Sequence, residues 1–396
     1  MDYLAKLNKY RVFQYEINSA AQFYHEMVQR TDKFSRLLGA NLIRHDFSMI
    51  NRTFAVMVCL HATYIYLFTT SMYYYRNDIE KILLNITTIG FSIQMLAKIH
   101  LYAFRRERIV EINDLNQIYY ENKYLDSKTV KDALIKSARL TYVVVKLNFI
   151  FSSAYWIVII TGPLTYSIIT QNRLLPFGFE WTHSDDWTAY AINFTSQAIL
   201  VFFVVVATIA SDDTFIVYLL TGCGQMDAIV ASLQDMNAMI DGDAQERKIT
   251  EQLTRIIKLH QHLLLYMTEL QDKYSGYFLI TLGVLSYIMI VSLFAFILIN
   301  WAMGLVLVLI GTSQLFFVCF LGTYLKMKYD ELLLEIWLLK WYKLSIRNQK
   351  SYLLFLNGAQ VPLSLTAIFT PLDMSAYLSI HKTLYSVCML MMQFTE

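Results

Sequence analysis

The chain has 396 residues, of which 56% are hydrophobic and only 16% are charged. Soluble domains usually carry about 25% charged residues, and a soluble protein of this size could not bury so much apolar surface. The composition therefore excludes a soluble protein and indicates an integral membrane protein, in which lipid replaces water as the solvent. The net charge of +2 is small, and we expect no nucleic-acid partner.

The first twenty residues, MDYLAKLNKYRVFQYEINSA, have the pattern of neither a signal peptide nor a transit peptide, so we expect the first apolar span to insert itself. The cysteines lie in or beside apolar runs, where a free thiol behaves as a small hydrophobe. They are Cys59, Cys223, Cys319 and Cys388. We expect no disulfide framework, no metal site and no cofactor, and no catalytic set of residues indicates an enzyme.

Apolar stretches long enough to cross a bilayer, which needs about 20 helical residues, recur along the chain. In chain order we predict spans at 53–75, 82–104, 140–163 and 187–211, two spans within 274–325, and a last span at 374–394. The 52 uncharged residues of 274–325 would cross about two and a half times as one straight helix. We therefore expect a hairpin at Asn300 and Trp301 between the fifth and sixth spans.

Two charged segments between the spans are predicted to form amphipathic helices. Within residues 212–273, apolar side chains recur at helical spacing, and we expect a helix that continues into the fifth span. Residues 329–349 are predicted to form the second such helix. Apolar faces outside the membrane need a partner surface, which either the same chain or a neighbouring subunit supplies. Glycine and proline interrupt residues 351–372, and we predict a bent connection into the last span.

The distribution of basic residues predicts the orientation of the chain. Of the 33 Lys and Arg, 28 fall on one face of the predicted topology and 3 on the other, with Lys146 and Lys382 inside spans. The positive-inside rule places the basic face, and with it the N-terminus, in the cytoplasm. With seven spans the C-terminus lies outside, so we predict an all-α membrane protein with the reverse topology of a G-protein-coupled receptor.

One face of the last span carries hydroxyl groups at helical spacing and then continues as large apolar side chains. A lipid-facing helix gains nothing from such a stripe, which suits water, a neighbouring helix or a pore axis. One interpretation is hydrogen bonding between helices through small polar residues. The other is a pore lining that ends in a hydrophobic constriction able to close by dewetting. The candidate pore and gate residues are Ser379, Thr383, Ser386, Leu390 and Phe394.

The outer halves of the second to fifth spans hold many aromatic side chains and few charges. Most of these are typical of core or lipid contacts, but a subset is expected to line an apolar pocket with occasional polar groups, suited to a small, mostly apolar ligand. The candidate pocket residues are Ile86, Gly90, Phe91, Ser152, Tyr155, Trp156, Phe194, Gln197, Val201, Tyr287 and Val291.

The C-terminal quarter resembles the insect odorant receptors. The resemblance rests on KWYKLSIRNQKSYLLFLNGAQVPLSL (residues 340–365) and TPLDMSAYLSIHKTLYSVCML (residues 370–390). The related gustatory receptors end in Thr-Tyr, five hydrophobic residues and Gln-Phe. This chain has five apolar residues before Gln393 and Phe394, but Ser386 and Val387 stand where that family has Thr-Tyr, which favours the odorant branch.

The resemblance implies a tetrameric, ligand-gated, non-selective cation channel of the plasma membrane of olfactory neuron dendrites. The seventh spans of four subunits would surround the pore, with the gate at Leu390 and Phe394, and each subunit would bind a small volatile organic molecule among spans 2 to 6. The family's shared coreceptor has a long insert between spans 4 and 5, which this chain lacks. We therefore expect an odour-binding subunit that forms a heterotetramer with the coreceptor.

On this interpretation, residues 1–325 form the first six spans with the ligand-binding bundle, 326–372 an assembly helix and bent connection, and 373–396 the pore-lining helix. The alternatives are a gustatory-type ligand-gated channel, a seven-helix G-protein-coupled receptor and a secondary transporter. The predicted cytoplasmic N-terminus argues against a G-protein-coupled receptor, which would need an N-terminus outside the cell. The transporter would tend to show broken spans in an internal repeat, which the sequence does not have.

Overall fold

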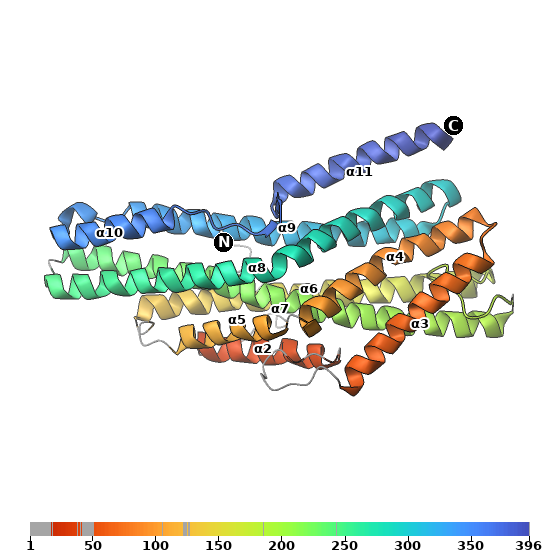
Figure 1. The fold of residues 1–396 in the computed structure, drawn as a ribbon, viewed down its shortest axis with the longest axis horizontal. Helices are drawn as coiled ribbons and strands as arrows, with labels where there is room; N and C mark the ends of the chain where they lie inside the picture. The colour runs from red at the N-terminus through yellow and green to blue at the C-terminus, as the bar shows by residue number, and fades with distance from the viewer. Residues whose placement is uncertain are drawn as a thin grey trace.

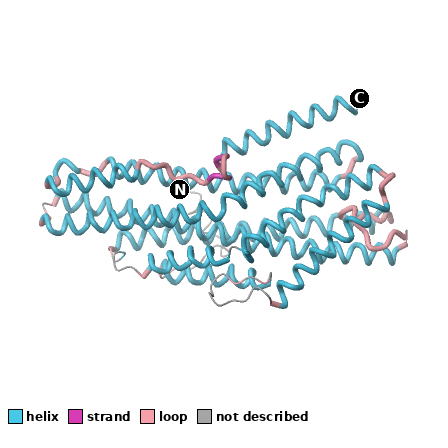
Figure 2. Tube along the Cα trace, viewed as in Figure 1, coloured by secondary structure: helices cyan, strands magenta, loops and turns pink. Residues whose placement is uncertain are grey.

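The computed structural model describes residues 17, 19–37, 39, 41, 51–104, 106–121, 125, 127–184, 186–242 and 244–395, and most of them are helical (Figures 1 and 2). In chain order the elements are α2 (Ala20–Leu37), α3 (Arg52–Tyr74), α4 (Ile79–Ile99), the π-helical turn η2 (His100–Phe104), α5 (Arg106–Tyr120), α6 (Lys128–Thr170), α7 (Trp187–Asp241), α8 (Glu246–Ile299), α9 (Ala302–Trp337), the 3-10 turn η4 (Trp341–Lys343), α10 (Ile346–Ala359), strands β1 (Thr366–Ala367) and β2 (Thr370–Pro371), and α11 (Met374–Thr395).

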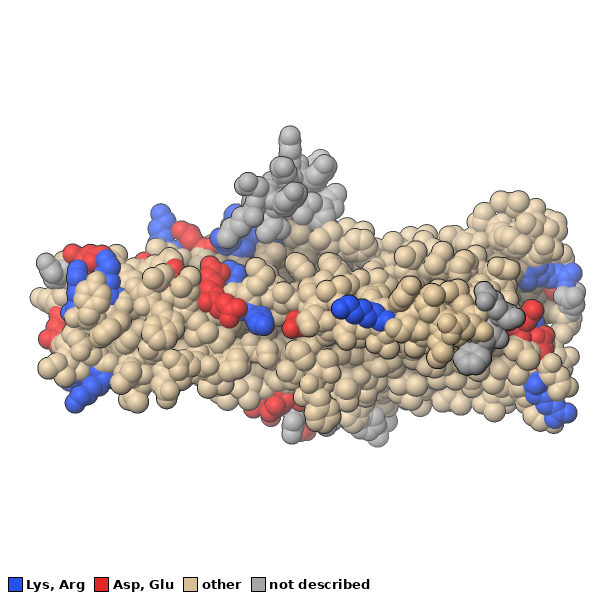
Figure 3. All heavy atoms as spheres, turned by 90° about the horizontal axis from the view of Figure 1, so that it is seen from above, with Lys and Arg blue, Asp and Glu red and all other residues tan. Residues whose placement is uncertain are grey.

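The molecule is elongated, and its two ends differ (Figure 1). At one end, here named the hairpin end, lie the connections between α3 and α4, between α6 and α7, and between α8 and α9. At the other, the bundle end, α7 turns into α8 and α9 leads into α10. On the face drawn in Figure 3, charged side chains gather over the bundle end and at the tip of the hairpin end, with few between them. This pattern fits a membrane around the hairpin half of the molecule.

Six helices among the described residues are long and apolar enough to cross a membrane: α3, α4, α6, α7, α8 and α9. They correspond to the first six predicted spans. The α8–α9 hairpin is confirmed at Asn300, whose left-handed φ of 49° ends α8, and Trp301, which precedes α9. The α11 helix has 22 residues, which give a length of about 33 Å.

The predicted helix that continues into the fifth span is confirmed as α8, a single helix of 54 residues, and α7 runs on similarly for 55 residues. The apolar positions Leu253, Ile256 and Leu259 are buried within the same chain. A hydrogen-bond network also joins the helices at the bundle end. The side-chain amide of Asn116 on α5 donates to the hydroxyls of Tyr24 on α2 and Tyr266 on α8, each at 3.1 Å.

The predicted bent connection before the last helix is partly helical. The α10 helix continues through Gly358 and ends at Ala359, because Pro362 follows with a fixed φ and no N–H group. The chain then forms a two-stranded hairpin with Thr366 opposite Pro371. The side chain of Gln271 on α8 fixes this hairpin, since it accepts from the Thr366 N–H at 3.0 Å and donates to the Thr366 carbonyl at 2.9 Å.

The start of α11 is attached to α9 by a close backbone approach. The hydroxyl of Thr323 accepts a hydrogen bond from the Met374 N–H at 3.0 Å. A Cβ atom placed on Gly322 would lie 1.8 Å from the Leu372 carbonyl oxygen, so only glycine fits there. Gly322 and Thr323 thus hold the first turn of α11 against α9, and we name these contacts the root of α11.

A side chain at position 322 is expected to separate α11 from α9. The variant Gly322→Ala should lower the free energy of unfolding by roughly 1–3 kcal/mol, as for other overpacked sites, because the obstructing atom is backbone and cannot move away. The measurement is the thermal unfolding midpoint of the purified protein. Gly283→Ala on α8 is the matched control, since no atom lies within 4 Å of the added methyl group. Equal midpoints for the two variants would contradict the close approach.

Candidate functional site

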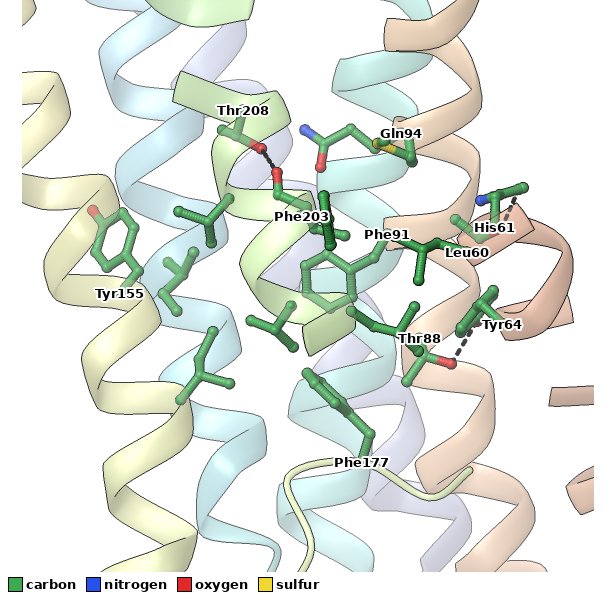
Figure 4. A pocket seen from close by; sticks show the side chains of 18 of the residues that line it. Leu60, His61, Tyr64, Thr88, Phe91, Gln94, Tyr155, Phe177, Phe203 and Thr208 are labelled. Carbon is green, nitrogen blue, oxygen red and sulfur yellow. Dashed lines mark hydrogen bonds between the residues drawn. The ribbon is translucent and has the colours of Figure 1, made fainter. Parts of the chain in front are cut away.

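A cavity of about 110 Å³ lies in the hairpin half of the molecule, among α3, α4, α6, α7 and α9 and under the loop of residues 171–186 (Figure 4). Its lining is mostly aromatic and aliphatic. The side chains come from Met57, Leu60, His61, Tyr64, Thr88, Phe91, Ser92, Gln94, Met95, Ser152, Tyr155, Ile159, Phe177, Phe179, Leu200, Val201, Phe203, Val204, Val205, Thr208, Ile310 and Gln314. An apolar cavity with a few polar groups is the usual form of a small-molecule site.

The loop of residues 171–186 forms the roof of this cavity through the rings of Phe177 and Phe179, which stack with centroids 6.0 Å apart. Gln197 on α7 is fully buried and holds the loop backbone. Its side-chain oxygen accepts from the Phe177 N–H at 3.0 Å, and its nitrogen donates to the carbonyls of Phe177 and Phe179 at 3.1 and 2.7 Å. Gln197 therefore satisfies the polar backbone of the roof and leaves only rings facing the cavity.

A polar cluster at the rim fixes the same loop to the hairpin of α3 and α4. The carboxylate of Glu180 accepts from the hydroxyl of Tyr75 at 2.7 Å and pairs with the ammonium of Lys81 at 3.0 Å. His183 stacks on Tyr74 with ring centroids 3.9 Å apart. The roof is thus attached both to α7 and to the start of α4.

Several polar groups on the walls bind one another across neighbouring helices. The hydroxyls of Tyr64 and Thr88 lie 2.7 Å apart, and those of Tyr155 and Ser313 lie 2.5 Å apart. The side-chain amide of Gln94, by contrast, forms no hydrogen bond with the part of the chain that the structure describes. In Figure 4, Gln94 and Thr208 lie at one end of the cavity and Phe177 at the other. The cavity therefore offers a ligand one polar end and one apolar end.

Four of the eleven residues predicted for the pocket line this cavity. They are Phe91, Ser152, Tyr155 and Val201. Gln197, as described, lies behind the roof. Two others make the contact between α4 and α8 instead: Tyr287 donates to the Ile86 carbonyl at 2.9 Å.

The four remaining candidates do not line this cavity. A Cβ on Gly90 would lie 2.4 Å from Ile288, so glycine allows α4 and α8 to approach closely. Trp156 packs edge-on against Phe202, with centroids 6.0 Å apart, and Phe194 contacts Tyr190. Val291 packs on the hydrophobic cluster of the hairpin half.

The sequence interpretation missed the contribution of the first span. His61 and Tyr64 line the cavity from α3, and they are three residues apart on one helical face. The sequence did offer a signal: two rings that carry polar groups lie on one side of a span that is otherwise mostly apolar. The roof rings Phe177 and Phe179 were also missed, because a loop sequence does not indicate which of its side chains turn inward.

The stripe on α11 is exposed in the single chain. Ser379, Thr383 and Ser386 are all exposed, and Leu390 has 54% of its surface exposed. The side chain of Phe394 lies outside the described side chains. The hydroxyls of Thr383 and Ser386 donate to carbonyls one turn back, so they are satisfied within α11.

Beside this stripe lies a further cavity, of about 120 Å³, between α8 and α11. Ser379 and Thr383 border it together with Ser286 and Met289 of α8. Beyond its root, α11 diverges from the bundle (Figure 1). The stripe is therefore available to water or to another chain.

The fold and cavity define a multi-pass helical membrane protein with an apolar site among its spans. A sequence model described as the 7tm odorant receptor family matches residues 78–385. The chain belongs to this odorant receptor family, as the sequence resemblance predicted. Among curated protein sequences, none matches the chain.

Solved structures show the same fold. The insect olfactory receptor OR5 from Machilis hrabei in complex with eugenol is similar with a TM-score of 0.74 and 18% identity, over 94% of this chain and 99% of that chain. The same receptor without a stated ligand is similar with a TM-score of 0.69 and 16% identity, over 93% of this chain and 98% of that chain.

Gln197 is expected to control the order of the roof. The variant Gln197→Ala leaves the Phe177 N–H and two carbonyls without partners, and each such loss costs roughly 1–3 kcal/mol. Hydrogen–deuterium exchange of residues 171–186 should therefore become about tenfold faster or more. Ser196→Ala, which removes only a bond to the Asn193 carbonyl within α7, is the control. Unchanged exchange in the Gln197 variant would contradict this role.

Proposed function

We propose that this chain is the odour-binding subunit of a ligand-gated, non-selective cation channel. The observation that carries the proposal is the apolar cavity beneath the Phe177–Phe179 roof in a member of the odorant receptor family. Its aromatic walls suit a small, volatile, mostly apolar organic molecule, because burial of apolar surface supplies most of the binding free energy there. Phe91, Tyr155 and Val201 are the residues we assign to direct ligand contact.

The channel part of the proposal concerns α11. We assign it as the seventh span, with the N-terminus of the chain in the cytoplasm and its C-terminus outside, in keeping with the excess of Lys and Arg on one side. Ser379, Thr383 and Ser386 would line a pore shared among subunits, and Leu390 with Phe394 would form its hydrophobic gate. The exposure of this stripe in the single chain supports the assignment.

Assembly would use the bundle end and residues 326–372. Large apolar side chains are exposed there on α9 and α10, including Trp337 at 56%, Ile346 at 74% and Leu354 at 75%. Exposed apolar patches of this kind are typical of subunit contacts. Because the α7–α8 connection carries no long insert, we assign the partner role to coreceptor subunits in a heterotetramer at the plasma membrane of an olfactory neuron dendrite.

The proposed mechanism couples the cavity to the gate through a shift of helix positions. A ligand that fits the cavity better when the spans move apart favours the open state, and it can bias opening only by its difference in affinity between the two states. Ion flow through the open pore is then passive. The residues 1–325 would bind the ligand, and 373–396 would conduct.

Current recordings from cells that co-express this chain with an odorant-receptor coreceptor test the proposal. Across an odorant panel, at least one small volatile compound should evoke a cation current that the coreceptor alone does not give. The variant Val201→Phe should raise the half-maximal concentration about tenfold or more, because a ring added to a packed site costs roughly 1–3 kcal/mol.

Ile199→Phe is the matched control, since Ile199 lies on the same helix with 47% of its surface exposed and adds its ring outside the cavity. If Val201→Phe and Ile199→Phe raised the half-maximal concentration equally, the result would contradict the assignment of the cavity as the odour site. The absence of any odour-evoked current in the presence of surface-expressed complex would contradict the channel proposal itself.

A further inference from the structure

A second cavity, of about 230 Å³, lies next to the first on its bundle side, among α4, α6, α7, α8 and α9. Four side chains line both cavities: Gln94, Ser152, Tyr155 and Gln314. The two spaces are therefore separated by a single layer of side chains. The second cavity has roughly twice the volume of the first.

The dividing layer contains amide groups that the protein leaves available. Gln94 is only 6% exposed, and neither its amide nor that of Gln314 forms a hydrogen bond with the described residues. Because these amides are not bonded to other described residues, a ligand can form hydrogen bonds with them without displacing a protein partner. Both residues line both cavities, and a side-chain amide can donate to a carbonyl or hydroxyl group and accept from a hydroxyl group.

The polar groups that line the second cavity are mostly uncharged. Asp212 lines it, and the Ser211 hydroxyl donates to its carboxylate at 3.1 Å. The ammonium of Lys98, which donates to the Thr208 hydroxyl at 2.5 Å, acts electrostatically on the same carboxylate. Apart from Asp212, the polar side chains that line the cavity are amides and hydroxyls, so it offers mainly hydrogen-bonding groups.

The second cavity is also the one nearer to the root of α11. Phe316 of α9 lines it, and its ring packs edge-on against Tyr377 of α11 with centroids 5.7 Å apart. Leu321, another lining residue, precedes Gly322, whose position permits the approach of the Leu372 carbonyl. A molecule in this cavity therefore touches the side of α9 that holds α11.

We propose that the two cavities are chambers of one elongated site. An uncharged odorant places its apolar body in the first chamber and its hydroxyl or carbonyl end on Gln94 and Gln314, extending into the second chamber. The Tyr155–Ser313 hydrogen bond between α6 and α9 closes the passage, and a ligand that reaches the second chamber opens it. This inference rests on the proposed function, whose odour site it specifies.

Photolabelling tests the two-chamber site directly. It is carried out on the purified complex of this chain and the coreceptor. The probe is octan-1-ol with a diazirine on its third carbon, so that the reactive group lies beside the hydroxyl. Labelled peptides are read by mass spectrometry, and the account predicts labels at lining positions of the second chamber, in residues 277–285 of α8 and 313–321 of α9. Labels confined to the first chamber, or absent from both chambers, would overturn the proposal.

Two variants distinguish labelling of the second chamber from labelling of the lipid-facing surface. Val318→Phe fills the chamber and should remove most of its label, whereas Leu309→Phe, on the same helix with 62% of its surface exposed, should keep it. Gln94→Leu should reduce the label from the alcohol several-fold and leave that from the matching diazirine octane unchanged. Equal labelling in Val318→Phe and Leu309→Phe would contradict a second chamber.

The photolabelling result and the proposed function fail separately. Labelling needs binding alone, whereas the odour-evoked currents need binding and opening. Label in the second chamber without any odour-evoked current would support the two-chamber site and contradict the channel proposal. Normal odour-evoked currents with label only in the first chamber would support the channel proposal and contradict the two-chamber site.

Discussion

The attachment of α11 at its root is the constraint on which the functional account depends. Gly322 and Thr323 hold the first turn of α11 against α9. Gln271 holds the β1–β2 hairpin that leads into α11. Further along, α11 leaves the bundle (Figure 1). The side chains of Ser379, Thr383 and Ser386 are exposed along this part of the helix. A helix that is held at its start and exposed along one face is available to water or to another chain, as the proposed pore requires.

The cavities and the root share α9, and this gives a physical path between ligand and helix. Tyr155 on α6 binds Ser313 on α9, and further along α9 Phe316 packs on Tyr377 of α11. The long helices α7 and α8 pass through both halves of the molecule, so the bundle end can serve as a fixed frame. Close-packed helices have few alternative arrangements, and small shifts at a site are amplified into discrete changes of packing.

The sequence predicted the features that depend on the membrane and on helix periodicity. The first six spans, the α8–α9 hairpin and the helix running into the fifth span follow from about 20 apolar residues per crossing and from the recurrence of Leu253, Ile256 and Leu259. Helix ends were predicted less well. The α6 helix passes Pro163 and ends at Thr170, because a proline within a long packed helix removes one hydrogen bond without ending it.

The lining of the cavity was predicted only in part, because it depends on how the helices pack. Phe91 and Tyr155 line the cavity, whereas Gln197, predicted for the same pocket, faces the loop backbone. The contribution of α3 and of the roof rings depends on contacts between segments far apart in the chain. Hydropathy identifies which segments lie in lipid. The direction in which each side chain of such a segment points is determined by tertiary packing.

The central claim, that the hydroxyl stripe of α11 faces a water-filled pore, is tested most directly by cysteine accessibility. Cysteines are placed singly at Ser379, Thr383 and Ser386, and at Tyr385 as an exposed position off the stripe, in a Cys388→Ser background co-expressed with the coreceptor. The account predicts that a cationic methanethiosulfonate reagent blocks the odour-evoked current at the three stripe positions and not at Tyr385. Block at Tyr385 alone, or at none of the four, would contradict it.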